Sequence, residues 1–325
     1  MNEKVFAAAF REFAVLDVTG DDAGQILHNV TTNDVRKLEP GEGIETCLTD
    51  VRGKVLGHGW MFRLADRFRF LGAAGQSETL ASHIDRYTIR EDATPHVRDA
   101  DWHVVATHTS DEKSALPSRI VAADDVYVPA TFSGSLQFRL MAAKARSDGS
   151  DQSPSAATMS AATPSAEPMT LEPMTAEQFH DLRVERFCPW YGIDVTEANL
   201  PQELARDSAA ISFTKGCYLG QETVARLDAL GQVQKKLVRL VDIEGDHRVG
   251  TVIHSDGKPV ARLTSVHSSG RSALAMVRRA WFEDGLSVRG DAVPPDLPPA
   301  ADASPSSGTR PFAARVASAS EPAAG

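Results

Sequence analysis

The segment Lys-Gly-Cys-Tyr-Leu-Gly-Gln-Glu, residues 215–222, combines the residue types that a reactive thiol requires. Cys217 lies shortly before the predicted start of a helix, and Lys215 places a positive charge two residues earlier. A helix N-terminus and a neighbouring cation both favour the thiolate, which is the nucleophilic and metal-binding form of cysteine. A glycine-rich turn with a buried cysteine is the alternative, because free cysteines are often small core residues. From these residues alone, the turn is the simpler interpretation.

The order of residues in this segment resembles Lys-Gly-Cys-Tyr/Phe-x-Gly-Gln-Glu, the signature of YgfZ-type folate-binding proteins. Their family also contains the T-protein of the glycine cleavage system, an aminomethyltransferase. Three further segments resemble the family, namely residues 20–35, 48–55 and 183–194. The resemblance covers most of residues 5–290 and implies an α+β fold of the aminomethyltransferase type.

This resemblance also implies a ligand, tetrahydrofolate. A glutamate in the Arg-x-Glu segment holds the pterin ring in the family, and Glu185 matches it, with Arg183, Tyr191 and Lys215 as further cofactor-binding residues. A carboxylate that accepts two parallel N–H bonds suits the amino-pyrimidinone edge of a pterin. Without the resemblance, Glu185 is a helix-surface charge paired with Arg183 or Arg186, because charges on helices are usually solvated.

Two departures from the family pattern bear on function. The aminomethyltransferases have an acidic pair, including the catalytic aspartate, where this chain has Gly57 and His58. The transferase acid is therefore missing, although a histidine near neutral pH can act as an acid–base group. Family members usually have a small residue where this chain has Arg186 and Phe187, so a large aromatic side chain either narrows the pocket or stacks on the ligand.

The leading hypothesis is a folate-binding accessory factor that supports iron–sulfur cluster assembly or repair in client enzymes, including enzymes that modify transfer RNA. Cys217 is then the catalytic thiol. The partners are iron–sulfur client enzymes or assembly proteins, without direct binding to nucleic acid or membrane. Two alternatives stay open: a folate-dependent aminomethyl- or demethylating transferase, and a ligand-free interaction scaffold.

Alternating strands and helices must position these residues. Hydrophobic periodicity predicts strands over residues 13–18, 59–64, 68–71 and 101–106, with a hairpin turn over residues 65–67. Helices are expected around Ile26, Leu27 and Val30, capped by side chains of residues 19–22, and over residues 77–87, 177–185 and 223–230. Gly231 suits a left-handed helix cap. This alternation indicates an α+β or α/β class.

Four strands over residues 236–242, 249–254, 259–263 and 272–277, separated by glycine-containing turns, indicate a small antiparallel barrel or sandwich. We therefore predict a folate-binding α+β domain over residues 1–232 and a C-terminal β-barrel domain over residues 233–290. A Ser-, Ala- and Pro-rich stretch at about 145–173 and another at 291–325 lack periodicity. Such compositions bury too little apolar surface to offset their ordering entropy, so we predict a disordered insertion and a disordered tail.

The formal net charge of −10 disfavours sequence-independent electrostatic binding to nucleic acid, because such binding requires clustered Lys and Arg residues. Three dispersed cysteines lack the C-x-x-C spacing of a zinc site or dithiol, and no pair of histidines with a third ligand predicts a metal site. No run approaches the roughly 18 apolar residues of a membrane helix, and no secretory signal begins the chain. A cytoplasmic protein without a resident metal is expected.

Overall fold

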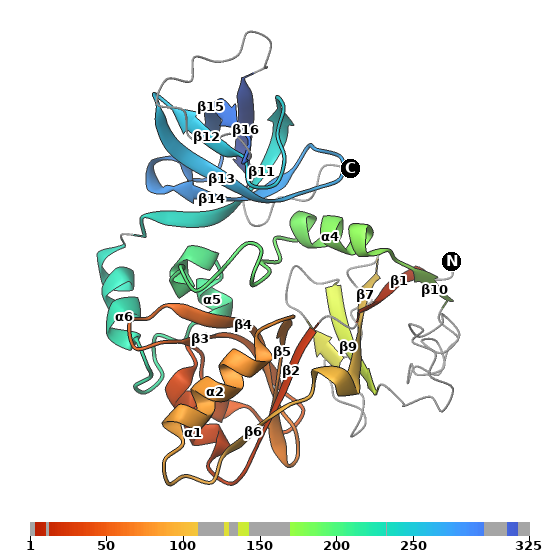
Figure 1. Cartoon of the computed structure of the whole chain (residues 1–325), viewed down its shortest axis with the longest axis vertical. Coiled ribbons are helices and arrows are strands. Elements are labelled where there is room, and N and C mark those ends of the chain that lie inside the picture. Colours follow the sequence, from red (N-terminus) through yellow and green to blue (C-terminus); the bar gives the residue numbers. More distant parts are fainter. Residues whose placement is uncertain are drawn as a thin grey trace. The chain divides into compact units, whose positions relative to one another are not determined.

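A computed structural model of the chain describes residues 4–10, 13–109, 127–129, 136–142, 170–231, 233–295 and 311–317. The chain divides into two compact units, which are described separately (Figure 1). Unit 1 comprises Met1–Phe179 and Ser208–Thr223, and unit 2 comprises His180–Asp207 and Val224–Gly325. Unit 2 thus takes in residues 180–207, which were predicted to belong to the N-terminal domain.

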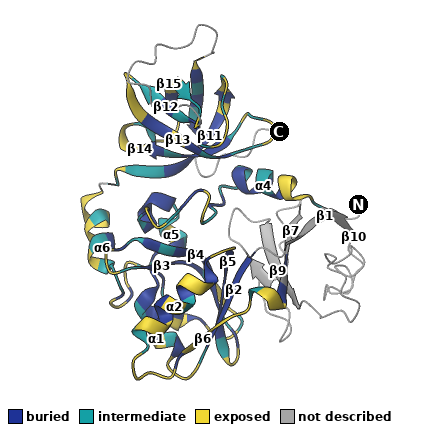
Figure 2. Ribbon diagram, viewed as in Figure 1, coloured by how far each residue is buried: buried dark blue, intermediate teal, exposed yellow. Residues whose placement is uncertain are grey.

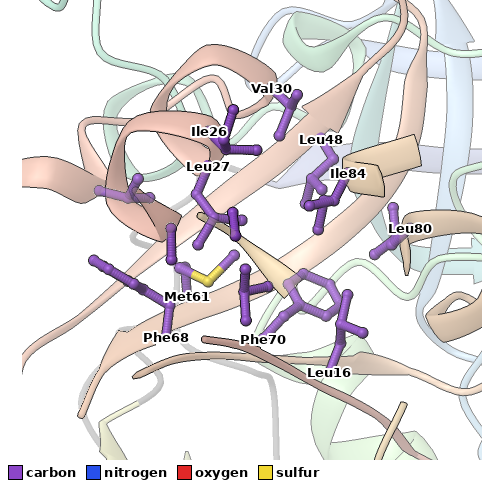
Figure 3. Packing of buried hydrophobic residues seen from close by; sticks show 14 of the residues in the cluster. Leu16, Ile26, Leu27, Val30, Leu48, Met61, Phe68, Phe70, Leu80 and Ile84 are labelled. Carbon is purple, nitrogen blue, oxygen red and sulfur yellow. The ribbon is translucent and has the colours of Figure 1, made fainter. Parts of the chain in front are cut away.

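Unit 1 is built around a five-stranded antiparallel sheet whose strand order is β3-β4-β5-β2-β6. Its strands are β2 (Phe13–Thr19), β3 (Gly43–Thr49), β4 (Val55–Arg63), β5 (Arg67–Ala73) and β6 (Thr94–Val97). Helices α1 (Ala23–Val30) and α2 (Ser77–Tyr87) pack against one face of this sheet (Figure 1). Their apolar side chains share one hydrophobic core with the strands, shown in Figure 3.

The sequence predicted several of these elements well. Helix α2 has the predicted bounds, and the β4–β5 hairpin turns where expected, with the Leu64 N–H donating to the Arg67 carbonyl at 2.8 Å. The predicted side-chain cap of α1 is wrong. Asp22 occupies the N-cap position but makes no capping bond, because its carboxylate instead accepts the Asp92 N–H at 2.8 Å.

Strands β2, β4 and β5 are buried on both faces (Figure 2). The face opposite α1 and α2 therefore also lies in the interior, and it carries polar residues. Asp17 and Arg69 form a two-bonded ion pair there, at 2.6 and 2.8 Å, and the Arg69 guanidinium lies 4.3 Å from the centre of the Trp102 ring. Buried charges are tolerated when they are paired in this way.

A second sheet of unit 1 has the strand order β10-β1-β7-β9-β8. Its strands are β1 (Lys4–Phe10), β7 (Trp102–Thr109), β8 (Tyr127–Pro129), β9 (Leu136–Ala142) and β10 (Thr170–Pro173). The β1–β10 pair is parallel and the other pairs are antiparallel. Most of the predicted insertion, residues 145–169, lies outside the described residues, whereas its last four residues form β10.

Three further helices are α4 (Ala176–Glu185), α5 (Asp207–Ala210) and α6 (Gln221–Leu230). Helix α4 ends with the Arg183–Glu185 motif, and α6 begins with the last two residues of the Lys215–Glu222 motif. Helix α6 begins four residues after Cys217 and is followed by Gly231, whose φ of 56° is left-handed, as predicted. Short 3₁₀ turns complete the elements, at η1 (Val35–Lys37), η2 (Asp99–Asp101), η3 (Pro201–Leu204) and η4 (Arg279–Trp281).

Unit 2 contains a closed antiparallel barrel with the strand order β11-β14-β13-β12-β15-β16, which confirms the predicted C-terminal barrel. Its strands are β11 (Lys235–Glu244), β12 (Val252–Ser255), β13 (Lys258–Val266), β14 (Ala273–Arg278), β15 (Ser287–Val293) and β16 (Phe312–Ala317). Strand β16 pairs with both β11 and β15 and closes the barrel. The predicted disordered tail over 291–325 therefore needs correction, because part of it supplies β16 and the end of β15.

Candidate functional site

The Cys217 segment is a loop that leads into α6. Cys217 is exposed, whereas Cys47 and Cys188 are buried. The loop is held on unit 1 through Leu219, whose N–H donates to the Asn29 carbonyl at 2.9 Å and whose carbonyl accepts the Thr49 hydroxyl at 2.7 Å. The structure thus contradicts the buried-cysteine alternative and presents the Cys217 thiol to solvent on a fixed loop.

Lys215 lies in the same loop, but its ammonium group points into unit 1. Its Nζ donates to three carbonyl oxygens at and just beyond the C-terminal end of α1: His28 at 2.7 Å, Thr31 at 2.6 Å and Asn33 at 2.9 Å. The last carbonyls of a helix have no partner within the helix, and a cation there also meets the negative end of the helix dipole. Lys215 therefore fastens the Cys217 loop to α1.

Burial has an electrostatic consequence for Lys215. Desolvation lowers the pKa of the Lys215 amine to about 7, with Asp34 opposing and Arg36 adding to this shift. The Nζ also lies 4.8 Å from the centre of the Tyr218 ring, whose face attracts a cation. The sequence predicted Lys215 as a cofactor-binding cation, and the structure places its charge against carbonyl groups of its own chain.

Gly53 and Gly220 bring two motif segments into direct backbone contact. Both residues have left-handed φ angles, 78° and 76°. A Cβ atom added to Gly220 would overlap the Gly53 backbone, and one added to Gly53 would lie 3.0 Å from the Gly220 carbonyl oxygen. Only glycine fits this approach without displacement. The turn between β3 and β4 and the turn before α6 are therefore joined at their glycines.

Glu185 is the last residue of α4, in unit 2. Its backbone carbonyl accepts a hydrogen bond from the Arg239 guanidinium of β11. Its side-chain Oε1 lies 3.1 Å from Nε2 of His267, and its side chain is 34% exposed. Glu185 is thus held by the barrel rather than by Arg183 of its own motif, and its carboxylate stays accessible.

Arg183, two residues before Glu185, is buried and fully engaged within unit 2. Its guanidinium donates to the Asp194 carboxylate at 2.6 Å and to the Ser265 hydroxyl of β13 at 2.5 Å. Asp194 also accepts the Ser265 hydroxyl at 2.7 Å and the Trp190 N–H at 3.0 Å. This network ties the end of α4 to the barrel, and Arg183 therefore supports Glu185 from within the protein.

Tyr191 and Phe187 belong to the turn that follows α4. Tyr191 is half-buried, and burial, followed by the negative charge of Glu197, raises the pKa of its phenol. Phe187 has a left-handed φ of 52° and packs against the cluster of Val184 and Leu237. A left-handed backbone conformation is unfavourable for residues other than glycine. The packing of the Phe187 ring therefore coexists with backbone strain at the same residue.

His58 has a buried partner, Glu45, that no sequence pattern predicted. Its Nε2 lies 2.9 Å from Oε1 of Glu45 on the neighbouring strand β3, and both side chains are buried. The Gln76 side chain accepts the His58 backbone N–H at 2.8 Å. His58 therefore has a carboxylate beside it, contributed by a strand that was not predicted.

The predicted site residues fall into both units. Cys217 and Lys215 belong to unit 1, whereas Glu185, Arg183 and Tyr191 belong to unit 2. In the part of the chain that the structure describes, no group of three or more His, Cys, Asp or Glu side chains could hold a metal ion. None of the described helices is long and apolar enough to cross a membrane.

Sequence comparison finds relatives named as transferases and a relative named as a tRNA-modifying protein. No protein-family model matches the chain. A chloroplastic protein of Arabidopsis thaliana named as a transferase is 25% identical over 293 residues, 85% of this chain and 66% of its own. A protein of Natronomonas pharaonis named as an aminomethyltransferase is 33% identical over 107 residues, 32% of this chain and 30% of its own. The tRNA-modifying protein YgfZ of Cronobacter sakazakii is 25% identical over 243 residues, 70% of this chain and 69% of its own.

The chain thus spans about two thirds of the first of these relatives and under a third of the second. Among solved structures, the glycine cleavage system aminomethyltransferase T from Bartonella henselae has a TM-score of 0.73 at 16% identity. That match covers 98% of this chain and 86% of the other, and it confirms the predicted fold. The chain is therefore similar in sequence to YgfZ and to aminomethyltransferases, and it shares the fold of aminomethyltransferase T.

Proposed function

We propose that the chain is a folate-binding accessory factor that supports iron–sulfur cluster assembly or repair in client enzymes of the cytoplasm. Tetrahydrofolate is its cofactor, and its partners are iron–sulfur client enzymes or assembly proteins. Some of these clients modify transfer RNA, so the effect of this factor on RNA is indirect. The name of the Cronobacter relative, a tRNA-modifying protein, supports this placement.

One observation supports the proposal. In both the Lys215–Glu222 and the Arg183–Glu185 motif, the cationic side chain is buried and the side chain with the proposed function is accessible to solvent. In the first motif, Lys215 is buried against carbonyl groups and Cys217 is exposed. In the second, Arg183 is buried against Asp194 and Glu185 is one-third exposed. Side chains that only stabilise the fold have no need of this access.

The accessible groups have the chemistry that the function requires. The two oxygens of a carboxylate accept two parallel N–H bonds, as the amino-pyrimidinone edge of a pterin offers. Glu185 is therefore the proposed pterin anchor. A thiolate is both a nucleophile and a ligand for iron–sulfur clusters, so Cys217 is the proposed group that serves the client.

Titration with tetrahydrofolate, followed by protein fluorescence, tests the cofactor. We expect saturable binding by the wild-type protein and at least a tenfold weaker affinity for Glu185→Ala, because the pterin edge loses its charged acceptor. Glu283→Ala, which removes an exposed carboxylate elsewhere in unit 2, is the matched control and should bind as wild type does. Absence of wild-type binding would refute the folate-binding function.

Complementation tests the thiol. Cells that lack their native factor and carry Cys217→Ala should have low activity of iron–sulfur enzymes, while wild type and Thr214→Ala, a change in the same exposed loop, should restore it. Immunoblots establish that the variants accumulate equally. Full enzyme activity with Cys217→Ala would show that the thiol is dispensable.

A folate-dependent transferase is the second candidate, favoured by the buried Glu45–His58 pair, whose N–O separation is 2.9 Å. A carboxylate beside an imidazole can orient the ring and assist proton transfer. Incubation with tetrahydrofolate, methylated glycines and an added two-electron acceptor, which the oxidation of an N-methyl group to the methylene level requires, followed by chromatographic detection of methylene-tetrahydrofolate, distinguishes the candidates. Product that disappears in Glu45→Gln would favour the transferase.

A further inference from the structure

His267, in the connection between β13 and β14, lies against two carboxylates of α4. Its Nε2 is 3.1 Å from Glu185 Oε1, and its Nδ1 is 3.7 Å from Asp181 Oδ1. The imidazole is 16% exposed, so it is partly withdrawn from solvent while Glu185 remains accessible. No sequence pattern connects these residues, because 82 positions separate His267 from Glu185.

The surrounding hydrogen bonds determine which ring nitrogen of His267 carries the proton in the neutral ring. The Ser269 backbone N–H donates to Nδ1 at 3.0 Å, which makes Nδ1 an acceptor. In a neutral imidazole the other nitrogen is then the donor, so Nε2–H points at the Glu185 carboxylate. The connection itself is fixed to α4, because the Ser268 N–H donates to Asp181 at 2.7 Å.

Glu185 is consequently restrained at both ends. The Arg239 guanidinium holds its backbone carbonyl, and the His267 N–H holds its carboxylate. The carboxylate keeps acceptor capacity, since its two oxygens together have about four lone-pair positions and His267 uses one. A glutamate side chain on a helix end is otherwise free to rotate, and fixing such a side chain in advance reduces the entropic cost of binding.

We propose that His267 is a positioning residue that presents the Glu185 carboxylate to the amino-pyrimidinone edge of a pterin. This inference rests on the proposed folate-binding function and adds the barrel's own contribution to it. The barrel acts through the β13–β14 connection, in which Ser269 selects the ring proton and Ser268 anchors the connection on Asp181.

The experiment titrates wild type, His267→Ala and His267→Gln with tetrahydrofolate and with an analogue whose 2-amino group is replaced by methyl. The analogue loses a donor that Glu185 would accept, so wild type should discriminate strongly between the two ligands. We expect His267→Ala to bind tetrahydrofolate about fivefold to twentyfold more weakly and to discriminate less. His267→Gln, whose amide N–H can replace Nε2–H, should recover much of both properties.

Controls separate positioning from a general loss of structure. His254→Ala, at another partly exposed histidine of the barrel, should leave affinity and discrimination unchanged. In a Glu185→Ala background, adding His267→Ala should cause little further loss, because the two residues act as one unit. If both ligands weaken equally in His267→Ala, or if its loss persists in the Glu185→Ala background, His267 is not a positioning residue.

The outcomes also distinguish this inference from the function on which it rests. Wild-type-like binding by Glu185→Ala would overturn the proposed pterin anchor itself. Weak binding by Glu185→Ala together with wild-type-like affinity and discrimination in His267→Ala would leave the anchor intact and overturn only the role of His267.

Discussion

The two motifs use buried cations in different electrostatic settings. Arg183 faces a carboxylate, Asp194, and also donates to a hydroxyl group. Lys215 faces three carbonyl oxygens, and the negative charge of Asp34 only partly offsets the lowering of its pKa by burial. A guanidinium stays charged in proteins, whereas a buried ammonium titrates. The Glu185 motif is thus supported by a permanent ion pair, and the Cys217 loop by a cation whose charge responds to pH.

Thiol accessibility gives the largest expected contrast between the two regions. Cys217 belongs to the first motif and is exposed, whereas Cys188 follows the second motif and is buried. Under native conditions a maleimide should modify Cys217 at least a thousandfold faster, because a buried thiol reacts only after structural opening. Peptide mass spectrometry after timed labelling measures both rates. Comparable rates would contradict the native burial of Cys188.

Removal of the Arg183 side chain should have the next largest effect, a loss of unfolding free energy. Arg183→Leu leaves the buried Asp194 carboxylate without its cation, and breaking one side of such a pair costs about 3–5 kcal/mol of unfolding free energy. Urea denaturation measures the loss. Arg226→Ala, an exposed arginine on α6, serves as the control and should change stability by less than about 0.5 kcal/mol. A similarly small effect for Arg183→Leu would mean that the ion pair contributes nothing.

Lys215→Met tests the pH-responsive cation. Loss of its hydrogen bonds to carbonyls should cost about 1–3 kcal/mol of unfolding free energy at high pH. Since folding lowers the pKa of Lys215 from 10.5 to about 7, the unfolded chain binds more protons between these values. The wild type should therefore gain stability relative to Lys215→Met as pH rises from about 7 to about 10.

Urea denaturation at several pH values across this range gives the comparison. Arg183→Leu is its internal reference, because a guanidinium does not titrate there and the difference from wild type should stay nearly constant. Parallel stability curves for wild type and Lys215→Met would show that the lysine has no titration linked to folding.

Relief of the backbone strain at Phe187 should have the smallest effect on the unfolding free energy. Both Phe187→Ala and Phe187→Gly remove the packing against Val184 and Leu237, but only glycine relieves the left-handed φ of 52°. Phe187→Gly should therefore be more stable than Phe187→Ala by about 1 kcal/mol. The difference between their urea midpoints isolates the strain, and a more stable alanine variant would contradict it.

Local sequence patterns correctly predicted the helices and turns whose conformation is determined mainly by residues within the same segment. Helix α2 alternates apolar and polar side chains with helical spacing, and its bounds were predicted at both ends. Gly231 ended α6 as expected, because the left-handed conformation favours glycine. The Lys215–Glu222 segment likewise pointed, from eight consecutive residues, to the proteins that the chain resembles in sequence.

Elements that depend on distant partners were missed. Strand β3 carries buried polar residues, including Glu45 and Thr46, so it lacks an alternating apolar pattern. Strand β16 is short and alanine-rich, and its pairing with β11 and β15 makes it a strand. The site partners Glu45 and His267 were missed for the same reason, since no local spacing reveals a contact across strands or across 82 residues.

The contact between Gly53 and Gly220 has a consequence for how this sequence can vary. A side chain at either position would separate the β3–β4 turn from the turn that starts α6, because the two backbones touch there. Compensation by a smaller partner is impossible, since glycine already has no side chain. The two positions therefore constrain each other, and Gly220 is expected to persist even in homologues that lack a cysteine at position 217.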